Sequence, residues 1–181
     1  MSNGEKRPFL QVHAIAVMLK EKLAPVCERI EIAGSLRRKK PMIGDIEFIL
    51  IPKRKMNMFG QKVGGYHLND LLSGWGSAIT LIKDGDKYKR FAFYTSNREL
   101  YSVDLFIQPD PATWGVNMMI RTGSAEFAKR MVTKQQHGGL MPDGLSVSGA
   151  RVWRGTQLLN TPEEGDVFKL WGMTYVKPED R

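Results

Sequence analysis

The sequence predicts an α+β fold in which helices pack on a mixed sheet and a small α/β lobe follows. Three observations support this: an opening segment with helical periodicity, several β-rich segments separated by turns, and a change to short strands and turns after residue 137. With 181 residues, of which 42% are hydrophobic, the chain can bury one core and a small appended lobe. We therefore predict a main domain over residues 1–137 and a C-terminal lobe over 138–181.

Helical segments are predicted from apolar spacing and capping residues. Apolar residues recur every three or four positions over 9–23, which is the spacing of one helix face, and Pro25 then ends the helix. Residues 67–75 and 113–123 are further helix candidates. A helix over 124–136 is predicted to begin with Ser124 as its N-cap.

Five segments have the composition or alternation of strands, and turn residues separate them. Asp84-Gly85-Asp86 is a hairpin signal between two of these segments. Residues 53–65 contain several glycines, and we expect them to form a loop. In the lobe, 147–153 is expected to be extended and a last helix to run over about 161–171. The five predicted strands of the main domain are 29–33, 45–51, 78–82, 88–94 and 100–107.

Composition and charge narrow the classes of partner and location. The net charge is +8 and the pI is near 9.6, which favours polyanionic partners such as nucleic acid. Cys27 is the only cysteine, so an internal disulfide and a cysteine-rich zinc site are excluded. No apolar run is long enough to span a bilayer and the first residues lack a secretory signal, so we expect a cytoplasmic, monomeric protein without membrane contact.

Three acidic residues occur where buried strands are predicted. Asp45 and Glu47 are two positions apart at the start of a strand, so both side chains project to the same side. Asp104 is an isolated charge inside the apolar segment 103–107. Carboxylates gathered in this way are costly unless a cation compensates them, and ligands that are all oxygen suit magnesium or manganese. The alternative for Asp45 and Glu47 is a solvated strand end. If the two strands are neighbours, the three acids could bind two metal ions.

A small-residue loop with arginines precedes these acids. Gly34 and Ser35 allow backbone amides to approach phosphate oxygens, the hydroxyl can donate to them, and Arg38 can form two bonds to a phosphate. Gly44 then leads directly into the acidic strand. The order of strand, phosphate loop and carboxylate strand supplies both halves of a nucleoside-triphosphate site.

These motifs resemble those of the DNA polymerase beta-like nucleotidyltransferases, family X. The shared patterns are Gly-Ser-x-Arg-Arg at 34–38, Gly-Asp-x-Glu at 44–47 and Val-Asp at 103–104. Thr-Gly-Ser at 122–124 and Pro-Glu-Asp-Arg at 178–181 are also similar to the family, so the resemblance covers nearly the whole chain from Phe9 onward.

The resemblance implies a palm that bears the three acids and a C-terminal lobe that closes over the new base pair. Asp45 and Glu47 would bind two Mg²⁺ ions, for which Mn²⁺ could substitute, and Asp104 would bind the catalytic ion and help to deprotonate the primer 3′-hydroxyl. The triphosphate would contact residues of the phosphate loop and the Thr-Gly turn, and two cations would face the template or the new pair. These nucleotide-contacting residues are Gly34, Ser35, Arg38, Gly44, Thr122 and Gly123, and the nucleic-acid-contacting residues are Arg121 and Lys129.

The sequence departs from the family pattern at several positions. Glu47 replaces the usual aspartate, Ala128 replaces a polar residue that often reads the base pair, and Ile120 and Arg121 replace aromatic residues that often check the sugar. The preference for deoxy- or ribonucleotides and the fidelity are therefore open. The accessory domains of larger family members do not precede the opening helix, so we expect the palm and the lobe to hold DNA.

Three functions compete on this evidence. The leading hypothesis is a minimal DNA polymerase that extends a 3′-hydroxyl on gapped or primed DNA, as in DNA repair. The second is a template-independent nucleotidyltransferase acting on RNA, protein or a small molecule, which the loss of the sugar check motivates. The third is a catalytically inactive nucleic-acid-binding protein, against which the complete set of three acids argues.

Overall fold

The computed structural model describes residues 5–181, which divide into two compact units. The second unit begins its main segment at Asp110 and not near residue 137, because residues 110–137 share a hydrophobic core with those that follow. The predicted assignment of a palm and a lobe stays a prediction. Within the described residues, unit 1 consists of 5–32 and Pro41–Pro109, and unit 2 of Ala33–Lys40 and Asp110–Arg181.

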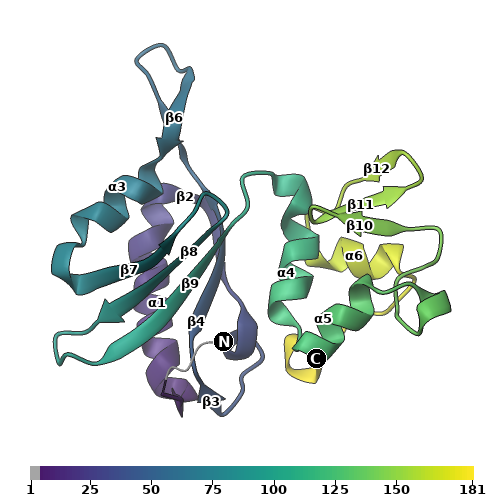
Figure 1. The fold of residues 1–181 in the computed structure, drawn as a ribbon, viewed down its shortest axis with the longest axis horizontal. Helices are drawn as coiled ribbons and strands as arrows, with labels where there is room; N and C mark the ends of the chain where they lie inside the picture. Colours follow the sequence, from purple (N-terminus) through teal and green to yellow (C-terminus); the bar gives the residue numbers. More distant parts are fainter. Residues whose placement is uncertain (1–4) are drawn as a thin grey trace. The chain divides into compact units, whose positions relative to one another are not determined.

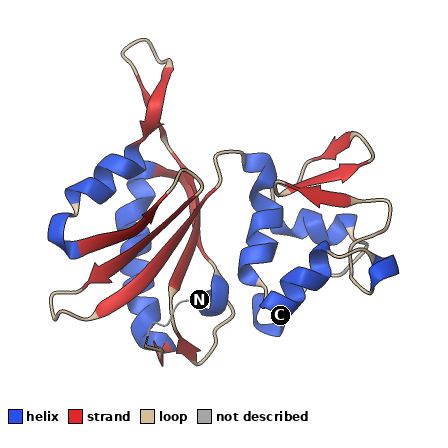
Figure 2. Cartoon of the chain, in the orientation of Figure 1, coloured by secondary structure: helices blue, strands red, loops and turns tan. Residues whose placement is uncertain are grey.

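Unit 1 is built on a five-stranded mixed sheet (Figures 1 and 2). The neighbouring pairs are antiparallel except β4 and β9, which run parallel. The predicted α+β class with a mixed sheet is confirmed, and β8 and β9 have the bounds predicted from the sequence. In spatial order the strands are β2 (Cys27–Ile32), β4 (Ile46–Pro52), β9 (Leu100–Ile107), β8 (Tyr88–Tyr94) and β7 (Ile79–Asp84).

Burial explains which strands lie inside the sheet. In β4 every residue except Glu47 is buried, and β9 has six buried residues among its eight. Such continuous apolar runs are typical of strands that are buried on both faces of a sheet. By contrast β7 exposes all of its residues except Ile79, in keeping with its place at the edge. The predicted turn at Asp84-Gly85-Asp86 does join β7 to β8 as an antiparallel hairpin.

Helix α1 (Phe9–Leu23) forms over the residues predicted for it and runs behind the sheet in Figure 1. It buries Val12, Ala16, Leu19 and Leu23, the residues that share one helix face. The 3-10 turn η1 (Ala24–Val26) contains Pro25 and follows immediately.

The remaining elements of unit 1 are short. Helix α3 (His67–Gly74) and the 3-10 turn η2 (Gly76–Ala78) precede β7, and Trp75 between them contacts the rings of Phe91 and Phe93 on β8. A two-residue ladder joins β1 (Arg7–Pro8) to β3 (Met42–Ile43).

The loop predicted over residues 53–65 is wrong, because this segment forms a hairpin of β5 (Arg54–Met56) and β6 (Lys62–Tyr66). The glycines that suggested a loop instead permit its bends. Gly60 and Gly65 have φ of +72° and +90°, a region that favours glycine. Figure 1 shows the hairpin projecting beyond the other strands of unit 1.

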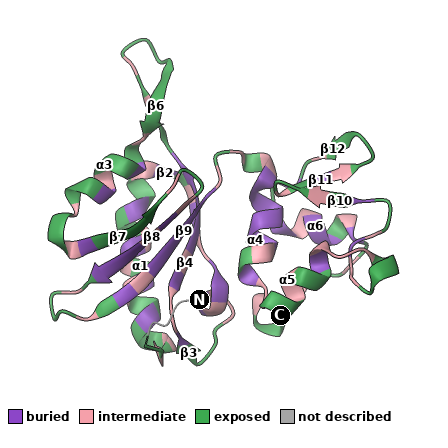
Figure 3. Ribbon diagram, in the orientation of Figure 1, coloured by how far each residue is buried: buried purple, intermediate pink, exposed green. Residues whose placement is uncertain are grey.

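Unit 2 combines helices with a three-stranded antiparallel sheet around its own core. Figure 3 colours stretches of α4 and α6 as buried, and the core includes Val116, Met119, Met131, Phe168 and Trp171. Its elements are α2 (Gly34–Arg37), η3 (Pro111–Thr113), α4 (Trp114–Thr122), α5 (Ala125–Val132), η4 (Gln135–His137), β10 (Ser146–Ser148), β11 (Arg151–Arg154), β12 (Gln157–Leu159), α6 (Glu164–Leu170) and η5 (Pro178–Asp180).

Ser124 is the N-cap of α5, as predicted, because its hydroxyl accepts the backbone N–H of Phe127 at 3.2 Å. The helix ends at Val132 and not at residue 136. Beyond it, Lys134 forms a bridge with Met141, so the backbone bonds that would continue the helix are made elsewhere. Among residues 5–181 we find no helix with the length and apolarity needed to cross a membrane.

Candidate active site

The sheet of unit 1 brings the three predicted acids together. Glu47 on β4 and Asp104 on β9 are partners in the register of the only parallel pair within this sheet, and Asp45 lies one residue before β4. In-register residues of paired strands project to the same face. Asp104 is buried at 2% exposure, whereas the other two acids are partly exposed.

The acids lie on the sheet face opposite the aromatic contact with α3. Phe91, which contacts Trp75, is in register with Val103, so the next pair, Arg90 and Asp104, projects the other way. Alternation along the strands thus separates an apolar face from a charged one. We call Asp45, Glu47 and Asp104 the acidic cluster.

Arg90 on β8 is the close partner of Asp104. Its Nε and a terminal nitrogen each donate to one carboxylate oxygen at 2.5 Å, and the Tyr88 hydroxyl donates to Oδ1 at 2.8 Å. This two-pronged geometry is the strongest pairing available to a carboxylate from a side chain. Sequence reasoning identified neither residue as part of the site, although Lys87, Lys89 and Arg90 form a basic run that points to this strand.

Electrostatics disfavour the charged form of Asp45. Burial raises the pKa of Asp45, the nearby Asp104 carboxylate raises it further, and Arg90 only partly offsets both effects. The pKa of Arg90 is itself raised, chiefly by its hydrogen bond to Asp104. The Arg90 guanidinium therefore acts on both Asp104 and Asp45.

The ligand chemistry of the acidic cluster fits a hard divalent cation, since all donors are carboxylate oxygens. However, over residues 5–181 no group of three or more His, Cys, Asp or Glu side chains forms a preassembled metal cage. Both oxygens of Asp104 are hydrogen-bonded to Arg90 instead. A metal ion bound by Asp104 would therefore compete with Arg90 for those oxygens.

A cavity of about 370 Å³ adjoins the acidic cluster within unit 1. Gly44, Asp45 and Arg90 line it together with Tyr101 and Ser102. Its volume lies within the range of pockets that hold small ligands, roughly 300–1,000 Å³. Gly44, predicted to approach the nucleotide, therefore lies beside accessible space.

The predicted phosphate loop lies in unit 2, where it forms the short helix α2. Gly34 has φ of +62° at its start, a conformation that favours glycine. Ser35 is partly exposed, and one terminal nitrogen of Arg38 donates to the backbone oxygens of Thr122 and Gly123 at 2.6 and 3.0 Å. The loop and the Thr-Gly turn, 84 residues apart, are thus joined by direct bonds.

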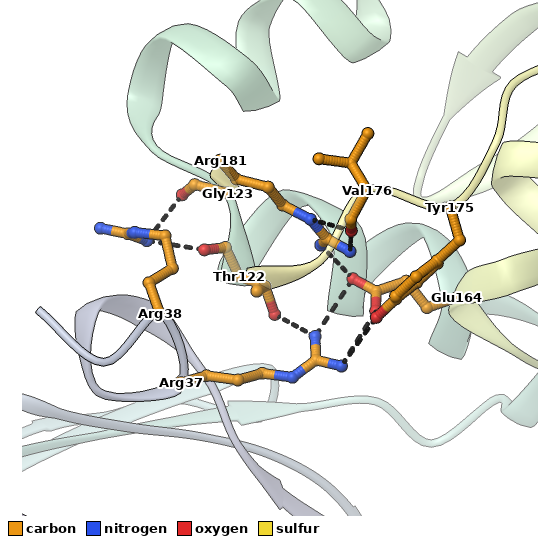
Figure 4. Close-up of polar contacts among 8 residues, drawn as sticks. All are labelled: Arg37, Arg38, Thr122, Gly123, Glu164, Tyr175, Val176 and Arg181. Atoms are coloured by element: carbon orange, nitrogen blue, oxygen red, sulfur yellow. Dashed lines mark hydrogen bonds and ion pairs between the residues drawn. The ribbon is translucent and has the colours of Figure 1, made fainter. Parts of the chain in front are cut away.

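A second charged cluster in unit 2 surrounds the buried carboxylate of Glu164 (Figure 4). Arg37 donates to both of its oxygens at 3.1 and 2.9 Å, Arg181 donates to Oε1 at 2.5 Å, and the Tyr175 hydroxyl donates to Oε2 at 2.8 Å. Arg37 also donates to the Thr122 hydroxyl at 2.6 Å. We call Arg37, Glu164 and Arg181 the arginine–glutamate network.

Aromatic rings complete this network. The Arg181 guanidinium lies 5.0–5.4 Å from the ring centroids of Phe127, Phe168 and Tyr175. Burial would raise the pKa of Glu164, but the bonds from Arg181 and Arg37 outweigh it and lower that pKa. Sequence reasoning noted the terminal Pro-Glu-Asp-Arg motif but not its partner, because Glu164 was assigned only to the start of a helix.

The two predicted nucleic-acid contacts also lie in unit 2. Lys129 is exposed on α5, and Arg121 is exposed near the end of α4. The structure therefore groups the predicted residues as follows. Unit 1 holds Gly44, Asp45, Glu47 and Asp104, and unit 2 holds Gly34, Ser35, Arg38, Arg121, Thr122, Gly123 and Lys129.

Comparison with known proteins identifies the fold. No family model matches the chain, and none of the curated proteins matches it. A solved structure of polymerase beta from Leishmania infantum, in a ternary P/T complex, is similar over 99% of this chain and 77% of the other. The TM-score is 0.74 and the sequence identity is 20%. The resemblance read from the sequence motifs is thus confirmed at the level of structure: the chain has the fold of a polymerase beta.

Proposed function

We propose that this chain is a metal-dependent nucleotidyltransferase that adds nucleotides to the 3′-hydroxyl of gapped or primed DNA. The observation that carries the proposal is the register of Glu47 and Asp104 on parallel strands, with Asp45 one residue before the first of them. This places three carboxylates at one end of a buried sheet. Carboxylates seldom gather in such a setting without a ligand that compensates their charge.

The environment of Asp45 supports a cation ligand. Burial, and after it the nearby Asp104 carboxylate, raise the pKa of Asp45, so its charged form is disfavoured without a cation. A divalent cation would supply that positive charge and would compete with Arg90 for the oxygens of Asp104. Mg²⁺, or Mn²⁺ in its place, would supply charge neutralisation for a triphosphate and activation of the acceptor hydroxyl.

Each acid then has a proposed part. Asp45 and Glu47 would hold both metal ions, and Asp104 would bind the catalytic ion and help to deprotonate the acceptor hydroxyl. Arg90 would hold Asp104 in place before the ligands arrive. Glu47 keeps the charge that the site requires, with one more methylene than an aspartate, so its oxygens reach farther from the strand.

In unit 2, we propose that Ser35 and Arg38 contact the triphosphate. The bonds from Arg38 to the Thr122–Gly123 turn fix the loop and the turn to each other, so both would present their polar groups in a defined arrangement. Arg121 and Lys129 would contact nucleic acid from the exposed surface of the same unit. The net charge of +8 suits a polyanionic acceptor.

A primer-extension assay tests the proposal. Wild-type protein with Mg²⁺, deoxynucleoside triphosphates and a gapped duplex should extend the primer by templated bases. Asp104→Ala should lower the rate at least about 100-fold, because transition-state stabilisation is lost, while DNA binding is kept. Asp86→Ala, which removes an exposed carboxylate in the β7–β8 turn, is the matched control and should extend normally.

Assays on single-stranded and gapped DNA, run side by side, distinguish the competing functions. Equal extension of single-stranded ends and gapped duplex would favour a template-independent transferase, for which Ile120 and Arg121 in place of aromatic residues are the motivation. DNA binding without incorporation of any nucleotide by the wild type would overturn the proposal in favour of a binding protein.

A further inference from the structure

The β5–β6 hairpin, residues 53–66, carries apolar side chains where a protein normally avoids them. Met58 and Phe59 are 90% and 78% exposed at its tip, and Met56 is 55% exposed beside them. Turn positions usually hold Gly, Pro, Asn, Asp or Ser, and local departures from such rules concentrate at functional sites. The tip is therefore a candidate interaction surface.

The tip is held in a defined conformation by its own hydrogen bonds. The Asn57 side-chain oxygen accepts the backbone N–H groups of Phe59 and Gln61, both at 3.0 Å, and Gly60 N–H donates to the Asn57 carbonyl at 3.0 Å. These bonds place Met58 and Phe59 at the two central positions of the turn. Both side chains are thus presented to solvent by an ordered backbone, and a partner would pay little ordering entropy to contact them.

The stem of the hairpin is entirely basic in its charged residues. Residues 53–66 include Lys53, Arg54, Lys55 and Lys62 and contain no Asp or Glu. Each of two cations is in register with an apolar or aromatic residue, Arg54 with Tyr66 and Lys62 with Met56. The Arg54 guanidinium lies 5.1 Å from the Tyr66 ring centroid, which is a cation–π contact.

Cations interleaved with aromatic and apolar side chains are the chemistry that binds single-stranded nucleic acid. The cations contact phosphates, and the rings stack on unpaired bases without reading their identity. An acidic protein surface could pair with the cations of the stem but would give the exposed ring no stacking partner. A lipid surface would bury only the two apolar side chains of the tip, which is too little apolar area for stable binding.

We propose that the β5–β6 hairpin binds unpaired DNA, with Phe59 stacking on a base, Met58 packing beside it, and Arg54 and Lys62 contacting the backbone phosphates. This inference rests on the proposed function, because it gives a DNA-extending enzyme a grip on the unpaired template. It assigns the exposed tip a role separate from the acidic cluster, which lies on other strands.

The test is binding of primed DNA with a single-stranded template overhang, measured by fluorescence anisotropy in EDTA without nucleotide. The double variant Met58→Gln/Phe59→Gln should raise Kd about tenfold or more, since a stacked base contributes about 1–3 kcal/mol to binding. A 2-aminopurine in the overhang should change its emission with the wild type but not with this variant. Leu10→Gln, which changes a 79%-exposed apolar residue of α1, is the matched control and should bind normally.

The charges are tested by salt dependence. Lys62→Gln should reduce the slope of log affinity against log salt concentration by about 0.7, the value for one single-strand phosphate contact. Lys22→Gln, which removes an exposed charge of α1, should leave the slope unchanged. Thermal melts of all variants should match the wild type, because each changed side chain is exposed.

Unchanged affinity and 2-aminopurine emission in the tip variant would overturn the inference. So would loss of binding to anionic lipid vesicles, rather than to DNA, in that variant. Because the assay needs neither metal nor nucleotide, it is independent of catalysis. If the wild type incorporated no nucleotide but its DNA binding still depended on the hairpin, the proposed function would fail and this inference would hold.

Discussion

The two units each contain a cluster of carboxylate and guanidinium groups, and the carboxylates are stabilised differently in the two clusters. In the acidic cluster of unit 1, Arg90 is hydrogen-bonded to Asp104 and only partly offsets the effects that disfavour the charge of Asp45. In the arginine–glutamate network of unit 2, two guanidinium groups and a tyrosine hydroxyl satisfy one buried carboxylate. The first cluster can still gain from a cation, whereas the second is saturated, so we infer that the first binds ligand and the second stabilises the fold.

The pKa shifts agree with this contrast. The pKa of Asp45 is raised, so its charged form is disfavoured in the folded protein. The pKa of Glu164 is lowered despite burial, so its charged form is favoured. The same replacement of a carboxylate by an amide should therefore change stability in opposite directions in the two units.

The largest effect on stability is expected in the network. Glu164→Gln removes a charge from between two arginines, and Arg181 is buried at 7% exposure. Loss of one partner of a buried ion pair costs about 3–5 kcal/mol. We expect a loss of that order in the free energy of unfolding, measured by urea denaturation. Glu126→Gln on the exposed side of α5 should change it by less than about 0.5 kcal/mol, as surface changes do. A comparably small change in Glu164→Gln would contradict the structural role.

The next effect concerns Arg90. Arg90→Gln removes the positive charge that competes for the oxygens of Asp104, so affinity for Mn²⁺ should rise, as measured by electron paramagnetic resonance of the free ion. In EDTA the variant should melt at a lower temperature than the wild type, because the carboxylates lose their partner. Addition of metal should then raise its melting temperature more than it raises that of the wild type. Unaltered Mn²⁺ affinity would show that Arg90 does not compete with the metal.

A smaller effect of opposite sign is expected at Asp45. Asp45→Asn removes a charge that burial and Asp104 disfavour, so in EDTA near neutral pH the protein should gain about 0.5–2 kcal/mol of stability, as functional residues often allow. Activity in primer extension should be lost at the same time. If Asp45→Asn were less stable than the wild type in EDTA, Asp45 would stabilise the fold, and the two clusters would not differ in this respect.

The smallest effect is the pH dependence. Because the pKa of folded Glu164 is below its usual value of 4.5, its stabilising contribution is present above that pH and is lost as the pH falls through the folded pKa. For Asp45 the sign is reversed: its contribution is present below 3.8 and is lost as the pH rises through the raised pKa. Between pH 5 and 3, the urea midpoint of Glu164→Gln should therefore fall less than that of the wild type. A parallel fall in both proteins would exclude Glu164 as the titrating group.

The fold was largely predictable from local signals. The apolar spacing of 9–23 and the β-rich composition of 88–94 and 100–107 gave α1, β8 and β9 with correct bounds, because each pattern matches the face that it buries. The β5–β6 hairpin was missed because its glycines and exposed side chains carry no burial pattern. The bounds of the compact units depend on core packing between distant segments, which periodicity does not reveal.

The proximity of Glu47 and Asp104 could be anticipated from the sequence, whereas the pairing of Arg90 with Asp104 could not. An isolated Asp104 in an apolar strand is conspicuous, since a buried charge needs an explanation. Arg90 and Glu164 lie in charged segments that no sequence pattern distinguishes. The pairing of Arg90 with Asp104 follows from strand register, and that of Glu164 with Arg37 joins residues far apart in the chain. The roles of the predicted site residues in binding and catalysis stay predictions that the substitutions above would test.

The origin of α2 has a consequence for biosynthesis. Residues 33–40 are made between two segments of unit 1, yet Arg37 bonds to Glu164, 127 residues later in the chain. During synthesis, this segment cannot form its native hydrogen bonds until the helix that carries Glu164 has been made. Contacts of such long sequence separation slow folding. A fragment that begins at Asp110 would lack Arg37 and would leave Glu164 with part of its partners missing, so the two units are not separable by a single cut.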